Sequence, residues 1–394
     1  MELQIGKLSA VAIAKKYGTP LYVYDKQIIL QKIQDLKDAF PNTNICYAIK
    51  ANANFTLLKL IAQQGVGADC CNVVEMTLAK EAGFDMSKSV FTTVNPTNKD
   101  LEKAMQLGIL INLDDISIFP RLLQYGTPQV ISFRVNPGFG KGKFNEVNVG
   151  GEGSKFGMDE ETLSKAYALA KESGIKRFGL HVHTGCIIFD EEYFQKLVRK
   201  VLEIAARIET SLDIRFEWID LGSGFGVPYE PGESPIDMHH LGKVFRQAFT
   251  HPAKLIIEPG RYIVAQSGTI LTEVTTVKGK FIGLDASMAT LIRPALYDAY
   301  HPFILANDPE KENTESYNLV GPVCETTDFF ARDRAMPKLQ EGNILAIQVS
   351  GAYGFVMASR YNGQSFPAEV LIDNEKDFLI RKKETTEDLL RGQL

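Results

Sequence analysis

Apolar and polar positions alternate in two distinct ways along the first two thirds of this chain. Short runs of four to seven residues, rich in apolar and β-branched side chains, are separated by longer stretches in which apolar residues recur every three or four positions. The first pattern predicts buried strands and the second predicts amphipathic helices. The segment from Asn44 to about Pro259 therefore predicts a series of strand–helix units.

Eight strands are expected in this segment. They are Ile45–Ile49, Gly67–Cys70, Ser89–Val94, Ile109–Leu113, Gln129–Val135, Phe178–Val182, Phe216–Leu221 and Lys254–Ile257. The helices expected between them are Phe55–Gln64, Val73–Ala82, Asn98–Leu107, Glu160–Ser173, Tyr193–Ile208 and His239–Phe249. The sequence from Thr97 to Asp100 predicts a capped start for the third of these helices. Eight such repeats fit a (β/α)8 TIM barrel better than an open, doubly wound sheet.

The pattern changes after about Val264, where strand-like runs follow one another with few helical segments between them. These runs are Gly268–Val277, Lys280–Asp285, Tyr317–Val320, Ile344–Ser350 and Ala368–Ile372. We expect a barrel domain over residues 26–263 and a mostly β domain built from residues 1–25 and 264–394. The charged tail Arg381–Leu394 is expected to be a solvated helix.

Composition narrows the class of protein. The 394 residues are 45% hydrophobic and 23% charged, which is typical of a soluble globular chain. A net charge of −5 without a basic block gives little support for nucleic acid or an anionic membrane as a partner. The five cysteines are scattered, the first residues lack a signal-peptide pattern, and no apolar run approaches the roughly 20 residues of a membrane helix. We expect a cytoplasmic protein that binds a small molecule.

Residues at the predicted strand ends matter most, because the active sites of (β/α)8 barrels form there. The first strand leads into Lys50, and a lysine desolvated at a barrel mouth has a lowered pKa that suits a Schiff-base nucleophile. The sixth strand leads into His181 and His183, which point to the same face. Such a pair could bind a metal, or one imidazole could stack on a flat cofactor, and the pattern leaves both open.

Two glycine-rich loops follow the seventh and eighth strands. They read Gly222-Ser223-Gly224 and Glu258-Pro-Gly260-Arg261. Glycines let backbone N–H groups approach an anion closely, and phosphate sites recur at these two strands of the fold. Arg261 adds a positive charge, and Glu258 offers a carboxylate that could face a ring nitrogen. The two loops together favour a cofactor that carries a phosphate.

The predicted β domain contains three further groups of candidate residues. Arg293 and Tyr297 offer a guanidinium and a phenol that suit a carboxylate. Cys324 and Glu325 place a thiol beside an acid, which suits delivery of a proton, and Tyr353 offers a phenol on a tight turn. Each feature alone is more often structural, so their value is joint.

Taken together, these motifs resemble the fold-type III pyridoxal-phosphate-dependent decarboxylases. The motifs are Tyr47-Ala-Ile-Lys50-Ala-Asn52, His181-Val-His183-Thr-Gly185, Glu258-Pro-Gly260-Arg261, Cys324-Glu325 and Gly351-Ala-Tyr353-Gly354. Others resemble the diaminopimelate decarboxylases of that family: Arg293-Pro-Ala-Leu-Tyr297 with Asp-Ala-Tyr-His301, Arg134-Val-Asn-Pro-Gly138 with Ser154-Lys-Phe-Gly157, and Met357-Ala-Ser359. The resemblance implies an alanine-racemase-like barrel with a β domain. It also implies decarboxylation of meso-2,6-diaminopimelate to L-lysine and CO2, a step of lysine biosynthesis.

The resemblance also implies residue roles. Lys50 would hold pyridoxal 5'-phosphate, His183 would stack on its ring, and Glu258 would pair with the ring nitrogen. The phosphate would be held by Gly222, Ser223, Gly224, Gly260, Arg261 and Tyr353. The substrate would be contacted by Arg261, Arg293, Tyr297, Glu325 and Tyr353. Cys324 would protonate the carbanion, and Cys324 and Glu325 would come from the partner subunit of a homodimer with shared active sites.

Three departures from the family pattern bear on detail. Ser223 stands where the glycine loop is often Gly-Gly-Gly, Cys186 stands where Ser is common, and the segment from Ala68 to Glu75 lacks the usual Ser-Gly-Gly run. A relative acting on a carrier-tethered glutamyl group, a D-amino acid, ornithine or arginine is the alternative within the family, although Arg293 favours a second substrate carboxylate that ornithine lacks. From other classes, a metal-dependent barrel hydrolase using His181 and His183, and a catalytically silent homologue, remain open.

Overall fold

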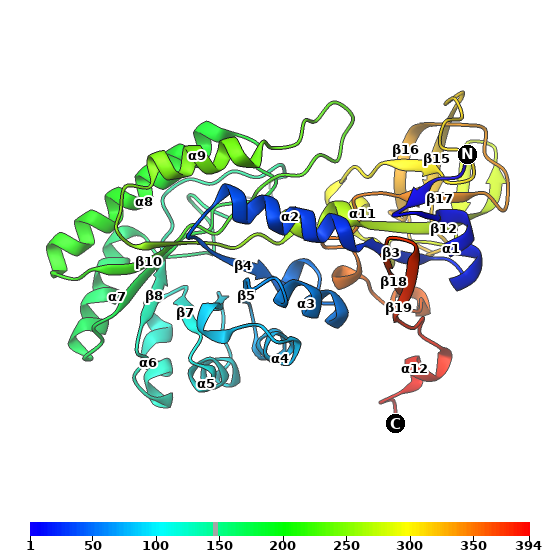
Figure 1. The fold of residues 1–394 in the computed structure, drawn as a ribbon. Coiled ribbons are helices and arrows are strands. Elements are labelled where there is room, and N and C mark those ends of the chain that lie inside the picture. The colour runs from blue at the N-terminus through cyan, green and yellow to red at the C-terminus, as the bar shows by residue number, and fades with distance from the viewer. Residues whose placement is uncertain (145–148) are drawn as a thin grey trace. The chain divides into compact units, whose positions relative to one another are not determined.

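The chain divides into two compact units in a computed structural model that describes residues 1–144 and 149–394. The barrel unit comprises residues 32–227 and 235–262. The β unit comprises residues 1–31, 228–234 and 263–394. Figure 1 labels the helices and strands of both units along the chain.

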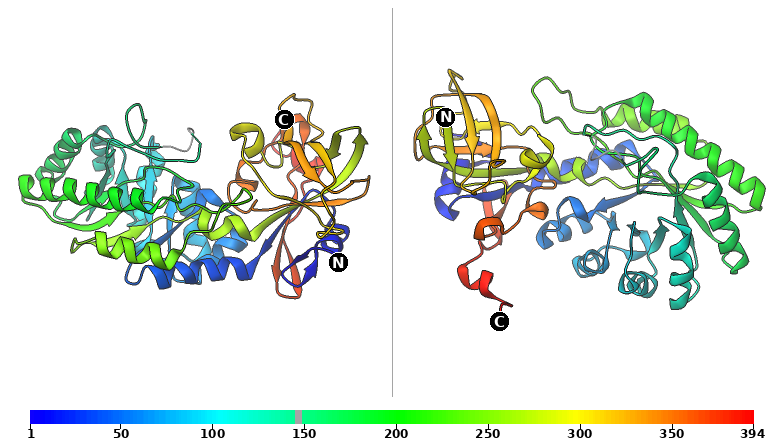
Figure 2. Two further views of the ribbon diagram at one scale, coloured as in Figure 1. Left: turned by 90° about the horizontal axis from the view of Figure 1, so that it is seen from above. Right: turned by 180° about the vertical axis from the view of Figure 1, so that it is seen from behind.

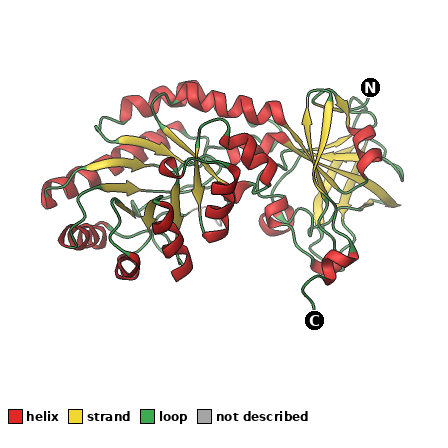
Figure 3. Cartoon of the chain, turned by 60° about the horizontal axis from the view of Figure 1, so that its bottom comes forward, coloured by secondary structure: helices red, strands yellow, loops and turns green. Residues whose placement is uncertain are grey.

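Eight parallel strands of the described barrel unit close into a barrel in the order β10-β11-β4-β5-β6-β7-β8-β9. They are β4 (Asn44–Ala48), β5 (Gly67–Cys70), β6 (Val90–Thr93), β7 (Leu110–Leu113), β8 (Ile131–Arg134), β9 (Phe178–His181), β10 (Phe216–Asp220) and β11 (Lys254–Ile257). Figure 3 shows the strands of this unit with helices outside them. The predicted (β/α)8 barrel is confirmed.

The helices between the strands follow the predicted pattern closely. They are α2 (Lys26–Ala39), α3 (Phe55–Ala62), α4 (Val73–Ala82), α5 (Asn98–Leu107), α6 (Phe119–Leu122), α7 (Glu160–Glu172), α8 (Glu191–Leu212), α9 (Met238–Ala248) and α10 (Arg261–Val264). Helix α5 begins with the predicted capping box, since the Thr97 hydroxyl accepts a hydrogen bond from the Asp100 amide at 3.2 Å and the Asp100 carboxylate accepts one from the Thr97 amide at 2.7 Å. Single 3-10 turns lie at Ile49–Ala51, Met86–Lys88, Ile116–Ile118, Leu123–Tyr125, Ala265–Ser267, Phe355–Met357 and Tyr361–Gly363.

Apolar side chains on the helix side of the strands hold the barrel together. Tyr167 of α7 packs edge-on against Phe133 and Phe216, with ring centroids 5.0 and 5.1 Å away. Its hydroxyl donates a hydrogen bond to the backbone carbonyl oxygen of Gly179 at 2.5 Å. Because alternate residues of a barrel strand face inward, the neighbours of these apolar residues line the lumen. Several of them are polar, as in the hydrogen bond from Asn112 to Thr92 at 2.9 Å.

The β unit is built around a nine-stranded sheet of the described residues. The path β16-β15-β13-β12-β3-β18-β19 is extended by β17, which pairs with β12 and with β14. Their bounds are β3 (Leu21–Asp25), β12 (Gly268–Lys278), β13 (Phe281–Leu284), β14 (Phe303–Leu305), β15 (Glu315–Val320), β16 (Phe329–Met336), β17 (Ile344–Ile347), β18 (Ala368–Asp373) and β19 (Lys376–Arg381). A two-stranded hairpin of β1 (Gln4–Ile5) and β2 (Leu8–Ser9) precedes the helix α1 (Ala10–Tyr17). The predicted mostly β part of the fold is confirmed.

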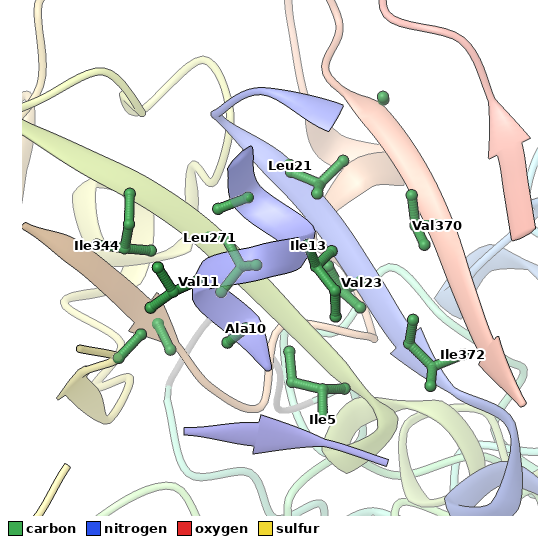
Figure 4. Packing of buried hydrophobic residues seen from close by; sticks show 14 residues of the cluster. Ile5, Ala10, Val11, Ile13, Leu21, Val23, Leu271, Ile344, Val370 and Ile372 are labelled. Atoms are coloured by element: carbon green, nitrogen blue, oxygen red, sulfur yellow. The ribbon is translucent and has the colours of Figure 1, made fainter. Parts of the chain in front are cut away.

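The two ends of the chain meet in the core of this unit. Strand β3 pairs antiparallel with β12 and parallel with β18, so a strand from the N-terminal region lies between two from the C-terminal third. Figure 4 shows Val11 of α1 beside Ile344 and Ile13 of α1 beside Val23, among the buried residues of one cluster. Both termini lie in the β unit, as the views in Figure 2 show.

One helix prediction is wrong in most of its length. The tail forms a helix only at α12 (Thr386–Leu390), and Arg381 is the last residue of strand β19, which pairs with β18. Arg381 is held by pairing with β18, and the capping box of Thr385 and Asp388 sets the start of the short helix five residues after the expected one. No helix among the described residues is long and apolar enough to cross a membrane.

Candidate active site at the strand ends of the barrel

Lys50 lies in a 3-10 turn directly after β4, at the end of the barrel where the strands finish. Its ammonium forms an ion pair with the carboxylate of Asp69 on β5. The side chain of Lys50 is 38% exposed, whereas that of Asp69 is fully buried. Burial, together with the charge of Glu258 and against that of Lys50, raises the pKa of Asp69 to about 7. The lysine therefore has beside it a carboxyl group that can accept or return a proton near neutral pH.

Asp69 was not among the site residues expected from the sequence. The sequence feature that could have revealed it is an acidic residue within the short apolar strand Gly67–Cys70, because a buried charge is expected only beside a partner. The partner, Lys50, follows the neighbouring strand, and only the register of β4 and β5 brings the two together.

His181 on β9 and His183, two residues further along the chain, have different surroundings. His181 is fully buried, with its Nε2 3.5 Å from Oε2 of Glu258. Burial, reinforced by the charge of Arg134, lowers the pKa of His183 to about 3, so its imidazole is neutral. Arg134 also donates a hydrogen bond to the His183 carbonyl oxygen at 3.0 Å, which fixes the backbone at this position.

This arrangement does not favour the metal interpretation of the histidine pair. That interpretation requires both imidazoles at one ion, but among the described residues only His181 joins a cluster with carboxylates, those of Asp220 and Glu258. His183 is available instead to lie against a flat group.

The predicted phosphate loop is held on both sides by hydrogen bonds. The Glu258 amide donates to the carbonyl oxygen of Gly222 at 2.8 Å, and the Ser223 hydroxyl donates to the carbonyl oxygen of Glu258 at 2.8 Å. The Ile188 amide donates to the carbonyl oxygen of Gly224 at 2.9 Å. Ser223 is therefore compatible with the loop, because its side chain ties it to the next strand.

Glycine is required at both ends of this loop. The backbone φ angles are +58° at Gly222 and +83° at Gly224, in the left-handed region. A Cβ at Gly222 would lie 2.3 Å from Nδ1 of His183, and one at Gly224 would lie 2.4 Å from the carbonyl oxygen of Gly185. The loop backbone therefore packs directly against His183 and Gly185, in a conformation that only glycine allows at both positions. Glycine-rich loops of this kind can present backbone N–H groups to a phosphate.

Arg261 follows the second glycine loop and is 7% exposed. Its Nε donates to Sγ of Cys186 at 3.3 Å, so the cysteine that departs from the family pattern orients the guanidinium. Gly260 packs closely, since a Cβ there would lie 2.9 Å from the Cβ atoms of Ala48 and Ala51 beside Lys50. The two predicted loops and the lysine therefore belong to one cluster of strand ends.

The buried polar atoms of this cluster fit pyridoxal phosphate. Oε1 of Glu258 is buried and accepts no hydrogen bond from an N–H or hydroxyl group of the described residues, as expected for a carboxylate that meets a ring nitrogen. Nδ1 of His183 is likewise buried without a partner in the described chain. A primary amine at Lys50, a carboxylate at Glu258 and a glycine cradle next to Arg261 match the three polar ends of this cofactor.

The other predicted residues lie in the β unit. Arg293 begins the short helix α11 (Arg293–Tyr297) and is 2% exposed. Its Nη1 lies 2.8 Å from Nε2 of His301, whose Nδ1 lies 2.9 Å from the carbonyl oxygen of Gln348. Since a carbonyl only accepts, Nδ1 of His301 carries the proton and Nε2 accepts from Arg293. The guanidinium also lies over the ring of Tyr229, with 4.7 Å to its centroid.

Cys324 and Glu325 lie on a turn that Asp328 anchors. The Asp328 carboxylate accepts hydrogen bonds from the amides of Val323 at 2.9 Å and Met288 at 2.6 Å. Cys324 is exposed. A hydrogen bond from the Thr326 hydroxyl lowers the pKa of Glu325, which keeps it ionised.

The Cys324 amide donates to Oδ1 of Asn362 at 2.8 Å. Tyr361, the residue before Asn362, has its hydroxyl 3.4 Å from Oε2 of Glu325. Tyr353 has a positive φ of +55°, which matches the tight turn expected there. The β-unit candidates therefore fall into groups around Arg293, around Cys324 and at Tyr353.

Comparison with known proteins identifies the family of this chain. The family model described as "Pyridoxal-dependent decarboxylase, pyridoxal binding domain" matches residues 26–265. A diaminopimelate decarboxylase of Methanothermobacter thermautotrophicus is 39% identical, over 99% of this chain and 95% of that protein, and one of Aquifex aeolicus is 35% identical, over 100% and 96%. The crystal structure of diaminopimelate decarboxylase from Helicobacter pylori complexed with L-lysine has a TM-score of 0.91 and 33% identity, covering 96% of this chain and 98% of that one.

These matches confirm the resemblance inferred from the motifs and, at the level of the family, the expectation of pyridoxal phosphate as cofactor. The family model covers more than half of the chain and includes all eight barrel strands. The chain therefore belongs to the family of pyridoxal-dependent decarboxylases.

Proposed function

We propose that this protein decarboxylates meso-2,6-diaminopimelate to L-lysine and CO2, as a soluble cytoplasmic enzyme of lysine biosynthesis. The observation that carries the chemistry is the cluster of Lys50, Asp69 and Glu258 beside a glycine cradle at one end of the barrel. The choice of substrate is supported by relatives named diaminopimelate decarboxylase over the whole chain, and by the L-lysine in the Helicobacter pylori complex.

Pyridoxal phosphate, when bound, supplies an electron sink for the electron pair left behind as CO2 departs. In this proposal Lys50 would hold its aldehyde carbon, Glu258 would face its ring nitrogen and His183 would lie against its ring. The phosphate would be held by Gly222, Ser223, Gly224, Gly260, Arg261 and Tyr353. The neutral imidazole of His183 suits this position, because it adds no positive charge against a cationic ring. Residues 26–263 are assigned to this cofactor-binding barrel.

Asp69 gives the amine of Lys50 a place to exchange its proton. An ammonium cannot act as a nucleophile, so Lys50 must lose a proton before it can bond to a carbonyl carbon. The adjacent carboxylate, with a pKa of about 7, can take up that proton without release to bulk water. The same carboxyl can return it when the amine leaves again.

The substrate contacts are assigned to Arg261, Arg293, Tyr297, Glu325 and Tyr353, with the β unit supplying most of them. Meso-diaminopimelate carries a carboxylate and an ammonium at its distal end, which Arg293 and Glu325 match in charge. Ornithine has no second carboxylate to offer to the positively charged guanidinium of Arg293. This difference is the physical basis for the choice of diaminopimelate.

Cys324 is assigned to protonate the carbanion after CO2 has left. Its side chain is an exposed thiol, a group that can donate a proton. We assign Cys324 and Glu325 to the active site of a partner subunit, which makes the enzyme a homodimer with shared sites. Residues 1–25 and 264–394 then supply substrate and dimer contacts.

The test is the release of CO2 by purified, cofactor-loaded protein from meso-diaminopimelate, L-ornithine and L-arginine in parallel. We expect turnover of meso-diaminopimelate to L-lysine and at least tenfold lower kcat/KM for the other two. Replacing Arg293 by Lys, which keeps the charge but not the planar fork, should lower kcat/KM for meso-diaminopimelate roughly 10- to 100-fold. A preference of the wild-type protein for ornithine or arginine would contradict the substrate assignment while leaving the cofactor site intact.

A further inference from the structure

Three titratable side chains form a cluster inside the barrel, behind the predicted cofactor site. His181, Asp220 and Glu258 belong to or follow the adjacent strands β9, β10 and β11, and one ligand atom from each lies within 4.8 Å of the others. Their exposed fractions are 0%, 1% and 5%. The roles assigned above use only Glu258, so the buried acid Asp220 has no assigned role.

Hydrogen bonds account for only half of the carboxylate oxygens in this cluster. Oδ1 of Asp220 accepts from the Gly222 amide at 2.9 Å, and Oε2 of Glu258 lies 3.5 Å from Nε2 of His181. Oδ2 of Asp220 and Oε1 of Glu258 are buried, and no N–H or hydroxyl group of the described residues reaches them. Two buried carboxylates at this separation repel each other strongly unless they share a proton or bind a cation.

The surroundings decide which carboxyl holds the proton. Burial raises the pKa of Asp220 well above its usual range, the charges of Glu258 and Asp69 raise it further, and only the Gly222 amide opposes them. Burial by itself would also raise the pKa of Glu258, but His181 and Lys50 outweigh it and hold that pKa below its usual range. The neighbouring Cys46 thiol stays neutral, because burial raises its pKa.

We propose that Asp220 is a positioning residue that keeps one proton and shares it with the carboxylate of Glu258. This inference rests on the proposed function, in which Glu258 faces the ring nitrogen of pyridoxal phosphate. A hydrogen bond donated to Glu258 lowers the affinity of its carboxylate for a second proton. The ring nitrogen therefore keeps its own proton, and the ring remains an effective electron sink.

A shared proton explains the geometry better than a bound cation does. The three side chains of the cluster are buried, so a hydrated ion has no exposed ligand atom to bind first. His183, the second histidine after the strand, is not part of the cluster. The Gly222 amide also uses one Asp220 oxygen, which fixes the carboxyl group with its other oxygen available for the proton.

The test compares Asp220→Asn, which keeps an N–H donor for Glu258, with Asp220→Leu, which removes it. Infrared difference spectra between wild type and Asp220→Asn at pH 7, taken on the purified full-length protein with and without cofactor, should show the carbonyl band of one protonated carboxyl in the wild type only. Binding of pyridoxal phosphate, followed by its absorbance, should be within about threefold of wild type in Asp220→Asn and roughly 10- to 100-fold weaker in Asp220→Leu.

Two results would overturn the proposal. One is the absence of that carboxyl band from the difference spectrum, which would show that Asp220 is ionised. The other is a stoichiometric metal ion in the purified wild type that Asp220→Asn loses. The infrared measurement tests whether Asp220 is protonated even if Asp220→Leu does not fold. The infrared measurement needs neither substrate nor cofactor, so its outcome does not depend on the proposed function. Failure of the proposed function would instead be seen as a wild-type protein that binds no pyridoxal phosphate.

Discussion

Replacing Gly224 by Ala tests whether the glycine loop is the phosphate cradle. The left-handed backbone at φ +83° would strain an alanine by about 1–2 kcal/mol wherever it occurred. At this position the new Cβ would also lie 2.4 Å from the carbonyl oxygen of Gly185, closer than the 3.0 Å that real Cβ contacts keep. The loop would have to move by about 0.6 Å or more, which would displace the backbone N–H groups proposed to hold the phosphate.

Each charge-assisted hydrogen bond lost in this way is worth about 1.5–3 kcal/mol, so pyridoxal phosphate should bind roughly 10- to 150-fold more weakly. Gly174→Ala is the matched control in the same unit, because Gly174 has φ +88° and a Cβ added there would meet no atom within 4 Å. It carries the same backbone strain without the clash, so it should lower the melting temperature but not the cofactor affinity.

The assay is a titration of cofactor-free protein with pyridoxal phosphate, followed by absorbance, together with thermal melting of each variant. We expect a loss of affinity in Gly224→Ala alone. If Gly224→Ala bound the cofactor within twofold of both wild type and Gly174→Ala, the loop would not be the phosphate cradle.

Three further predictions concern residues of the barrel unit and of the β unit. The carboxyl of Asp69 binds its proton more tightly in the native state than in the unfolded state, so wild-type stability should decline by up to about 4 kcal/mol as the pH rises from about 4 to 7. Asp69→Asn removes this dependence, so its melting temperature should rise relative to wild type over the same pH range. A difference in melting temperature that does not change with pH would contradict this. Asp114→Ala should lower the free energy of unfolding by about 3–5 kcal/mol, because it removes the ion-pair partner of the buried guanidinium of Arg134, 3.3 Å away. Glu161→Ala, which breaks an exposed ion pair with Lys165, should lower it by less than about 1 kcal/mol. Equal losses in the two variants would show that the buried ion pair stabilises the fold no more than the exposed one. Cys324→Ala should bind the cofactor normally but form lysine about 10²- to 10⁴-fold more slowly, and an unchanged rate would remove Cys324 from the reaction.

The sequence predicted the elements of the barrel well because their signals are local. All eight predicted strands occur, with ends that differ by at most two residues, as at Gln129–Val135 against Ile131–Arg134. The cap at Thr97 and the glycines after β10 follow from the chemistry of single turns. These features depend on residues only a few positions apart, so one sequence is enough to find them.

The sequence did not predict the contacts that set the electrostatics of the site. Lys50 with Asp69 and Arg261 with Cys186 join residues that lie on or follow different strands, and their approach depends on how those strands pair rather than on the sequence pattern. The strand β19 was missed for a related reason, because its exposed, charged sequence gains its structure from backbone pairing with β18. Long-range pairing of this kind leaves little trace in the alternation of apolar and polar residues.

The central claim is that Lys50, at the end of β4, is the residue that holds the cofactor. The most direct measurement is reduction of pyridoxal-phosphate-loaded protein with sodium borohydride, followed by proteolysis and mass spectrometry of the labelled peptide. We expect a single pyridoxyl group on Lys50, and none in Lys50→Ala. A label on a different lysine, with Lys50 unmodified in the wild type, would contradict it.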